Sequence, residues 1–417
     1  MNSTTAPFTH RQWISLFTLA AAQFINLLDF MLVMPLGPRF IEKMNISPEQ
    51  FGHMVASYGF AAFGGGMLAS GFIDRFERKR AMLVVFALFS VSTFFCGVAD
   101  DYASLVFSRA MTGLFGGVVG SMTMTLVSDL FHESRRGFAL GIVAVSFAVA
   151  SIIGVPMSLW IADISQSVRV PFFALACVSV TIWFLMLVSL PTLRGHILSE
   201  PASYWKTLRE QFSVPSHCLA YLYTVSLVFG TFTVAPYIAT YMVSNVGLRK
   251  FDVKYIYIVG GGCSFIAMPI IGRLTDRLGK KSVFWFFATL TIVPTILITN
   301  LGLVSLPWAI SITTLYMTLT SGRMVPAQAL IAAATIPSRR AGFMSVNSAI
   351  QHLASGMAAS LSAAILQMGE NKAIVGFWIV GLIATAATLI SLPLASVLLG
   401  SSAKAQPEAP QVIELVE

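Results

Sequence analysis

Apolar runs of about 20 residues or more occupy most of this 417-residue chain. A helix needs about 20 residues to cross the hydrocarbon core of a bilayer, so each run is long enough for one crossing. The chain is 56% hydrophobic and 11% charged, whereas soluble domains carry about 25% charged residues. We therefore predict an all-α integral membrane protein with twelve transmembrane helices and exclude a soluble enzyme. The predicted spans are 13–40, 51–73, 81–99, 103–128, 137–162, 170–190, 216–243, 255–274, 283–302, 307–332, 341–367 and 373–398.

Most of the 26 Lys and Arg residues lie in alternate loops between these runs. Basic loops mark the cytoplasmic side of a membrane protein, which predicts a multi-pass protein of the cell (bacterial inner) membrane with both termini in the cytoplasm. The net charge of +8 is therefore a topology signal, and no nucleic-acid partner is expected. All four cysteines lie in apolar runs, so we expect no disulfide framework, no metal site and no cofactor.

The two halves of the chain resemble each other. Landmarks recur at a nearly constant spacing: Asp74-Arg75 with Asp276-Arg277, Pro35 with Pro236, and Arg135-Arg136 with Arg339-Arg340. Such repeats are typical of secondary transporters with two bundles around a central cavity. The predicted organisation is an N-terminal six-helix bundle (1–190), a cytoplasmic linker (191–215), a C-terminal six-helix bundle (216–398) and a disordered tail (399–417).

Asp29 is the acid that the sequence places deepest in the membrane. It lies within the first apolar run, and Gln23 and Asn26 precede it at steps of three, so the three residues share one helix face. A charged group at the centre of a bilayer costs at least about 2.5 kcal/mol and is by default a functional candidate. The alternative is a structural acid that hydrogen-bonds to a neighbouring helix.

The loop after the second run resembles a signature of the major facilitator superfamily, G-x-L-A-D-R-x-G-R-K. The first copy, Ser70 to Lys79, departs from it at Ser70 and Glu77, and the second, Gly272 to Lys281, fits closely. The resemblance implies two pseudo-symmetric bundles and a latch on the cytoplasmic side; the alternative is that these charges only set topology. The implied gate-latch residues are Asp74, Arg75, Glu133, Arg135, Arg136, Asp276 and Arg277.

Spans 4 and 5 carry further motifs of the superfamily. Arg109-x-x-x-Gly113 resembles its span-4 arginine motif, which is associated with proton coupling. Span 5 reads Gly154-Val155-Pro156 without the glycines of the drug:proton antiporters. In this respect the chain is more similar to the arabinose-efflux-permease-like branch.

Asp29 and Arg109 are predicted to lie at a similar height. At about 1.5 Å per residue, both fall in the outer half of the membrane, on spans that face the cavity in this family. A neighbouring arginine favours the ionised carboxylate, whereas burial favours the protonated one. We therefore predict that Asp29 carries a coupling proton and that Arg109 controls its release.

Polar, aromatic and methionine side chains on the first span and on spans 7, 10 and 11 are predicted to line a substrate cavity. Arg323 would attract anionic ligands, or alternatively bond backbone carbonyls at the inner gate. His352 can titrate near neutral pH, or alternatively pack as a hydrogen-bonded residue. The candidate cavity residues are Gln23, Asn26, Phe30, Met34, Tyr237, Arg323, Asn347, Gln351 and His352.

These features predict a secondary active transporter, acting by proton-coupled efflux of a small amphipathic or organic-anion compound. The alternatives on the same fold are a proton-coupled or facilitative importer of a small nutrient, or a lipid or lysolipid transporter. A membrane enzyme would need a cluster of acids, histidines or thiols at one depth, which the spans lack. The expected partners are the substrate, protons and the lipid bilayer, and the expected state is a monomer.

Overall fold

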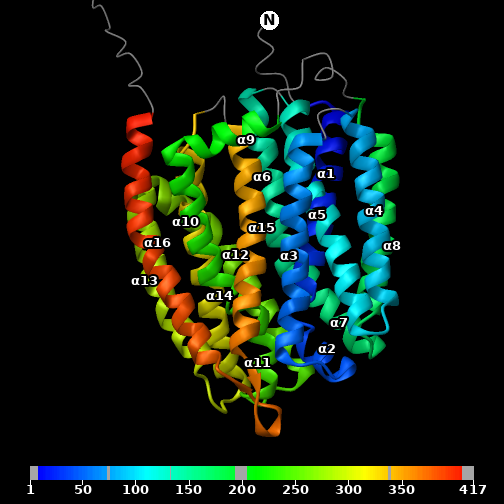
Figure 1. The fold of residues 1–417 in the computed structure, drawn as a ribbon, viewed down its shortest axis with the longest axis vertical. Helices are drawn as coiled ribbons and strands as arrows, with labels where there is room; N and C mark the ends of the chain where they lie inside the picture. The colour runs from blue at the N-terminus through cyan, green and yellow to red at the C-terminus, as the bar shows by residue number, and fades with distance from the viewer. Residues whose placement is uncertain (1–7, 73–75, 132, 193–203, 337–339, 406–417) are drawn as a thin grey trace, which may run out of the picture.

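The computed structural model describes residues 8–72, 76–131, 133–192, 204–336 and 340–405. It is a bundle of long helices that run roughly parallel to one axis (Figure 1). We call its two ends the α9 end, near the N-terminus, and the hairpin end, where a short antiparallel pair of strands lies.

The first half of the chain supplies six membrane-length segments and one short helix. They are α1 (His10–Leu32), α2 (Gly37–Met44), α3 (Pro48–Phe72), α4 (Arg78–Val98), α5 (Tyr102–Leu130), α6 (Glu133–Val149) continued by the π-helical η2 (Ala150–Gly154) and α7 (Val155–Ser165), and α8 (Val170–Ser189).

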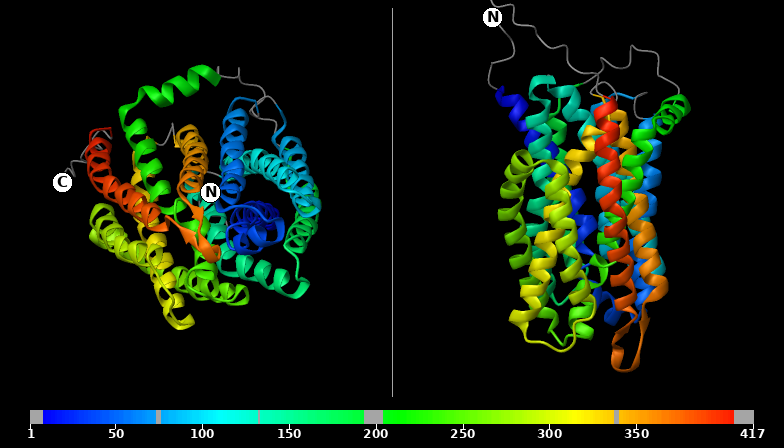
Figure 2. Two further views of the ribbon diagram at one scale, coloured as in Figure 1. Left: turned by 60° about the horizontal axis from the view of Figure 1, so that its bottom comes forward. Right: turned by 90° about the vertical axis from the view of Figure 1, so that its left-hand side faces the viewer.

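The second half repeats this plan. Its elements are α9 (Tyr204–Ser213), α10 (Pro215–Phe232) continued by η3 (Ala235–Tyr237) and α11 (Ile238–Ser244), η4 (Lys250–Asp252), α12 (Val253–Leu278), α13 (Lys280–Thr299), α14 (Leu306–Ala333), α15 (Arg340–Ile365), the hairpin β1 (Gln367–Met368), η6 (Glu370–Lys372) and β2 (Ile374–Val375), and α16 (Phe377–Ala405). Viewed along the bundle, the helices of the two halves gather on opposite sides (Figure 2).

Prolines interrupt the first span of each half at matching places. Pro35 lies in the break between α1 and α2, and Pro236 lies in η3 between α10 and α11. Proline lacks a backbone N–H and its ring clashes with the preceding turn, so it ends or kinks a helix. This match supports the internal repeat that the sequence predicts. In the fifth span Pro156 follows the π-helical η2, a local widening of the kind that accommodates such a disruption.

The two halves meet along α3 and α15, which lie side by side at the centre of the molecule (Figure 1). Gly59 and Gly356 face each other there: a Cβ added to Gly59 would lie 2.8 Å from the backbone N of Gly356. Small residues allow such close backbone contact between membrane helices, where packing replaces the hydrophobic effect. A side chain at either position would push the halves apart.

The twelve predicted spans are confirmed. Nine helices in the described ranges combine the length and apolar composition of a membrane span. The other three, α3, α14 and α15, contain at least 25 residues each. The predicted linker contains the helix α9, and α16 continues to Ala405, beyond the predicted start of the tail. The predicted division into four segments stays a prediction.

Candidate proton and substrate site

Asp29 and Arg109 form a buried ion pair between α1 and α5. The Arg109 Nη1 lies 2.6 Å from Asp29 Oδ2, and the two side chains are 0% and 1% exposed. Arg109 Nη1 also donates to the backbone carbonyl of Asp29 at 3.3 Å, and the Thr93 hydroxyl donates to Asp29 Oδ1 at 3.3 Å. The predicted similarity in height is therefore an actual contact, in which both carboxylate oxygens accept a hydrogen bond.

Tyr58 of α3 supports this pair from one side. Its ring lies 4.6 Å below the Arg109 guanidinium, and its hydroxyl donates to Asn26 Oδ1 at 3.1 Å. The Asn26 amide in turn donates to the carbonyl of Gly116 at 3.1 Å. The motif glycine Gly113 allows this approach, because a Cβ there would lie 2.4 Å from the carbonyl oxygen of Tyr58. Asn26 thus belongs to the surroundings of the ion pair.

Phe30 connects this site to the second half. Its ring lies 5.2 Å from Tyr58 of its own half, and 5.5 Å from Phe232 and 6.3 Å from His352 of the other half. Phe30, Phe232 and His352 are all partly exposed. We call this contact of Phe30 with Phe232 and His352 the seam between the halves. Since Asp29 precedes Phe30, a movement of α1 at the ion pair also moves the Phe30 ring at the seam.

The other predicted cavity residues do not form one cluster. Asn347 accepts a hydrogen bond from Thr224 at 2.7 Å, and Tyr237 donates to the carbonyl of Pro48 at 3.0 Å, across the two halves. The Gln23 side-chain oxygen is buried without a hydrogen-bond partner in the described structure. Met34 is buried and Gln351 is partly exposed.

Arg323 of α14 is fully buried in the second half. Its Nη1 donates to the Thr388 hydroxyl at 2.7 Å and its Nη2 to the Thr231 hydroxyl at 2.8 Å. Its hydrogen bonds therefore go to threonine hydroxyls of α16 and α10, and the alternative of bonding to backbone carbonyls is not what the described contacts show.

The predicted latch falls partly outside the described residues, namely Asp74, Arg75 and the side chain of Glu133. Among its other members, Arg135 lies over the ring of Phe8 at 5.4 Å, Arg136 is partly exposed, and Asp276 and Arg277 are exposed. At the same end Arg78 and Asp129 form an ion pair between α4 and α5. The role of the latch stays a prediction.

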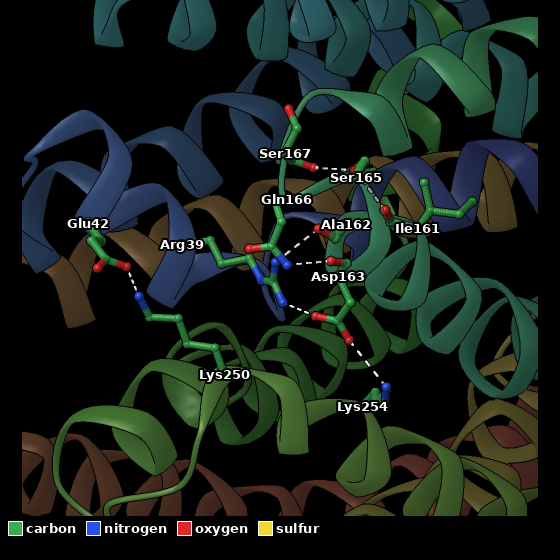
Figure 3. A network of polar contacts seen from close by, with 10 residues as sticks. All are labelled: Arg39, Glu42, Ile161, Ala162, Asp163, Ser165, Gln166, Ser167, Lys250 and Lys254. Atoms are coloured by element: carbon green, nitrogen blue, oxygen red, sulfur yellow. Dashed lines mark hydrogen bonds and ion pairs between the residues drawn. The ribbon is translucent and has the colours of Figure 1, made fainter.

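Sequence reasoning missed a network at the hairpin end (Figure 3). The Asp163 carboxylate at the end of α7 pairs with Arg39 of α2 and accepts from Lys254 Nζ of α12 at 3.3 Å. Lys250 pairs with Glu42 close by. Both Lys254 and Lys250 belong to the second half, so ion pairs join the two halves at this end. Arg39, Glu42 and Asp163 are ordinary loop-proximal charges in the sequence, and no local pattern identifies their partners.

Twelve membrane spans in two six-span halves, with a buried acid–arginine pair between α1 and α5, are typical of one class of protein, the polytopic secondary transporters. The profile of the Major Facilitator Superfamily matches residues 19–228 and 220–414. The chain therefore belongs to the major facilitator superfamily, a family of transporters and not of enzymes.

Similar proteins agree with this assignment. The chain is 26% identical over 254 residues to the uncharacterised MFS-type transporter YceJ of Bacillus subtilis (strain 168), covering 60% of this chain and 64% of that protein. It is 24% identical over 266 residues to multidrug resistance protein 2 of the same organism, covering 62% and 66%. These matches thus span just under two thirds of the relatives' length.

Solved structures share the fold. A bacterial homologue of the human lysosomal transporter Spinster, in an inward-facing and unoccupied conformation, matches with a TM-score of 0.69 at 15% identity, over 97% of this chain and 100% of that one. A variant of the nucleoside transporter NupG matches with a TM-score of 0.71 at 12% identity, over 93% and 99%.

Proposed function

We propose that this protein exports a small amphipathic or organic-anion compound in exchange for protons, by alternating access. The observation that carries the proposal is the buried Asp29–Arg109 ion pair. Other buried acids of the described chain, Glu77, Asp163 and Asp252, lie at or beside helix ends. Asp29 is thus the described acid whose protonation would change the charge within the membrane core.

Protonation and the ion pair exclude each other. A protonated Asp29 no longer neutralises Arg109, and an unpaired buried charge is costly. Proton uptake must therefore accompany a rearrangement that gives Arg109 water or another partner. A proton that cannot bind without a rearrangement is the physical requirement for coupling.

The seam supplies the connection to the second half. Neighbouring positions on an α-helix point about 100° apart, so Asp29 contacts α5 while Phe30 contacts Phe232 and His352. When Asp29 and Arg109 separate, a rotation or shift of α1 displaces Phe30 from the second half. This displacement would couple the proton to the rocking of the two bundles.

The orientation follows from the basic loops, which lie at the α9 end, and this end is proposed to face the cytoplasm. The hairpin end then faces outward, and its ion pairs between Asp163 and Lys254 and between Glu42 and Lys250 hold the halves together there. This arrangement supports a conformation that is closed to the outside. The names of the multidrug resistance relatives support export, while import and lipid transport remain the alternatives on this fold.

The test measures proton movement in proteoliposomes. Compounds that raise the melting temperature of the purified protein are first selected from a drug and metabolite panel, and each is then added to vesicles that contain a pH-sensitive dye. We expect compound-dependent proton flux in the wild type and its loss in Asp29→Asn. Glu49→Gln, which removes an exposed acid at the hairpin end, is the matched control and should keep the flux.

Full compound-dependent proton flux in Asp29→Asn would refute the proposed role of Asp29. Direction is a separate measurement, because alternating access is reversible. Accumulation of the same compounds in cells should rise when a protonophore is added if the protein exports them, and should fall if it imports them.

A further inference from the structure

Arg323 lies in surroundings that contain hydrogen-bond donors and no negative charge. Within the described chain it has no ion pair, and its two hydrogen bonds go to Thr231 and Thr388. Each threonine already donates its own proton to a backbone carbonyl one turn earlier, Leu227 and Ala384 respectively. Both hydroxyls therefore serve Arg323 only as neutral acceptors, and the guanidinium charge stays uncompensated.

Several buried polar atoms around this group lack a partner in the described structure. They include Arg323 Nε and the hydroxyl of Tyr223, which lies within electrostatic range of Arg323. The Thr385 hydroxyl is a third, one turn from Thr388 on α16. Buried polar atoms are hydrogen-bonded in nearly all folded proteins, so each exception requires a water, an ion or a ligand. An N–H and two hydroxyls around a cation can all donate, and such a set suits an anionic oxygen.

The group borders the seam between the halves. Thr231 is partly exposed, and the next residue, Phe232, is the one that contacts Phe30. Gly230 lets the guanidinium approach α10, because a Cβ there would lie 3.1 Å from Arg323 Nη2. Thr231 thus lies between Arg323 and the seam, which is the side from which a compound between the bundles would approach.

We propose that Arg323 binds the anionic oxygen group, carboxylate or phosphate, of the transported compound, with Tyr223 as a second donor. This inference rests on the proposed transport function and names the chemistry of its substrate. The headgroup would lie in the second half and supply a negative charge beside Arg323, where the described residues supply none. The apolar part of the compound would contact the rings at the seam.

The test is a melting-temperature measurement on the full chain in a neutral detergent. The probes are 4-phenylbutyrate, its neutral amide 4-phenylbutanamide, and dodecyl phosphate. An anionic probe at saturation should raise the wild-type melting temperature by at least about 2 °C more than the amide. Arg323→Gln should lose this difference and Arg323→Lys should keep part of it. Arg340→Gln, which removes an exposed arginine, should behave as the wild type.

Two results would overturn the inference: an anion-dependent shift that persists in Arg323→Gln, or no such shift in the wild type with either anion. An Arg323-dependent response to phenylbutyrate identifies a soluble organic anion as the ligand type, and one to dodecyl phosphate alone identifies a lipid-like ligand. The melting assay has no membrane and no proton gradient, so a failure of proton coupling is seen separately, in the flux assay.

A third measurement separates binding from structure. Without a probe, Arg323→Met should melt at or above the wild-type temperature, because the variant removes an uncompensated buried charge and leaves both threonine protons bonded. A loss of stability as large as that of Arg109→Met would make Arg323 a structural residue and overturn the inference.

Discussion

The two halves of this transporter each bury one arginine completely, and the groups that surround the two guanidinium charges differ. In the first half, Asp29 neutralises Arg109 at 2.6 Å and Tyr58 lies against its face. In the second half, Arg323 contacts hydroxyls only. The sites also lie at different depths, since Arg109 is seven residues from the start of α5 at the hairpin end and Arg323 is ten residues from the end of α14 at the α9 end.

Under the proposed function, this difference determines where charge changes during transport. A proton can bind at Asp29 because an acid is present, and it alters the first half by one charge. No acidic side chain of the described residues pairs with Arg323, and in the inference above the bound compound supplies the negative charge. The two halves therefore share an arrangement of helices but differ in the groups around the buried arginine.

The largest expected effect is that of Arg109→Met. It leaves Asp29 buried without its cation, and breaking a buried pair in this way costs about 3–5 kcal/mol. We expect a strongly lowered melting temperature and loss of coupled proton flux. Thermal unfolding in detergent at pH 7 checks the first effect and the vesicle assay the second.

The double variant Asp29→Leu with Arg109→Met tests whether the lost stability comes from the unpaired carboxylate of Asp29. Replacing both partners of a buried pair by apolar residues is often neutral or stabilising, so most of the lost stability should return while coupling stays absent. Stability that does not return would mean that the pair is needed for folding itself.

The next effect concerns the hairpin end, where charge joins the two halves. Asp163→Asn weakens the contacts to Arg39 and Lys254, each a hydrogen bond to a charged group worth about 1.5–3 kcal/mol. We expect more frequent opening at this end. A single cysteine in place of Thr240, which is buried between α11 and α2 at this end, should then react faster with a membrane-impermeant maleimide added from outside.

The matched control is Glu42→Gln, which breaks the more exposed pair with Lys250. Exposed ion pairs contribute only about 0–1 kcal/mol, so labelling should change little. Equal acceleration by both variants would show that overall charge, and not the buried Asp163 contact, holds this end together.

A smaller effect is expected from Tyr58→Phe. The variant loses the hydrogen bond to Asn26, worth about 1 kcal/mol, but keeps an aromatic face against Arg109. Coupled flux should persist with a modest decrease in melting temperature. Tyr58→Leu, which removes the ring, should impair flux more; identical behaviour of the two variants would rule out a role of the ring in holding Arg109.

The smallest effect concerns Asp101, whose carboxylate is exposed, whereas that of Asp29 is fully buried. Asp101 caps α5, and the hydrogen bond from the Ser104 backbone N–H lowers the pKa of Asp101. A lowered folded-state pKa stabilises the protein above the unfolded value of about 3.9 and loses this effect as the pH falls through the folded-state pKa. Asp101→Asn keeps a capping side chain, so its melting temperature should fall less than that of the wild type between pH 5 and pH 3. Parallel curves would contradict this.

Much of the fold could be predicted because membrane helices depend on local composition. Lengths of apolar sequence predict the spans, and Pro35 and Pro236 mark the repeat, although the helix breaks beside them were not predicted. The helix α9 was missed because its sequence, Tyr204–Ser213, is polar and short. The break at η2 was also missed, since a π-turn depends on how the surrounding helices pack.

The candidate site divides in the same way. Asp29 and Arg109 could be predicted because a charge in an apolar run is conspicuous, and counting residues places both at one height. Tyr58, Thr93 and Thr388 could not be predicted as members of these sites. Hydroxyl groups and aromatic rings are common in membrane spans, and only the three-dimensional contacts show which of them face a charged group.

The sequence by itself determined the membrane setting, the number of spans and the isolated acid, since each is a local property of stretches of about 20 residues, and it also determined the repeat, since matching landmarks recur along the chain. Only the tertiary structure decided which charges are paired. It joined Asp29 to Arg109 across 80 residues and Asp163 to Lys254 across 91, and it left Arg323 among hydroxyls. Pairing depends on the rotation and packing of separate helices, and no local pattern encodes these.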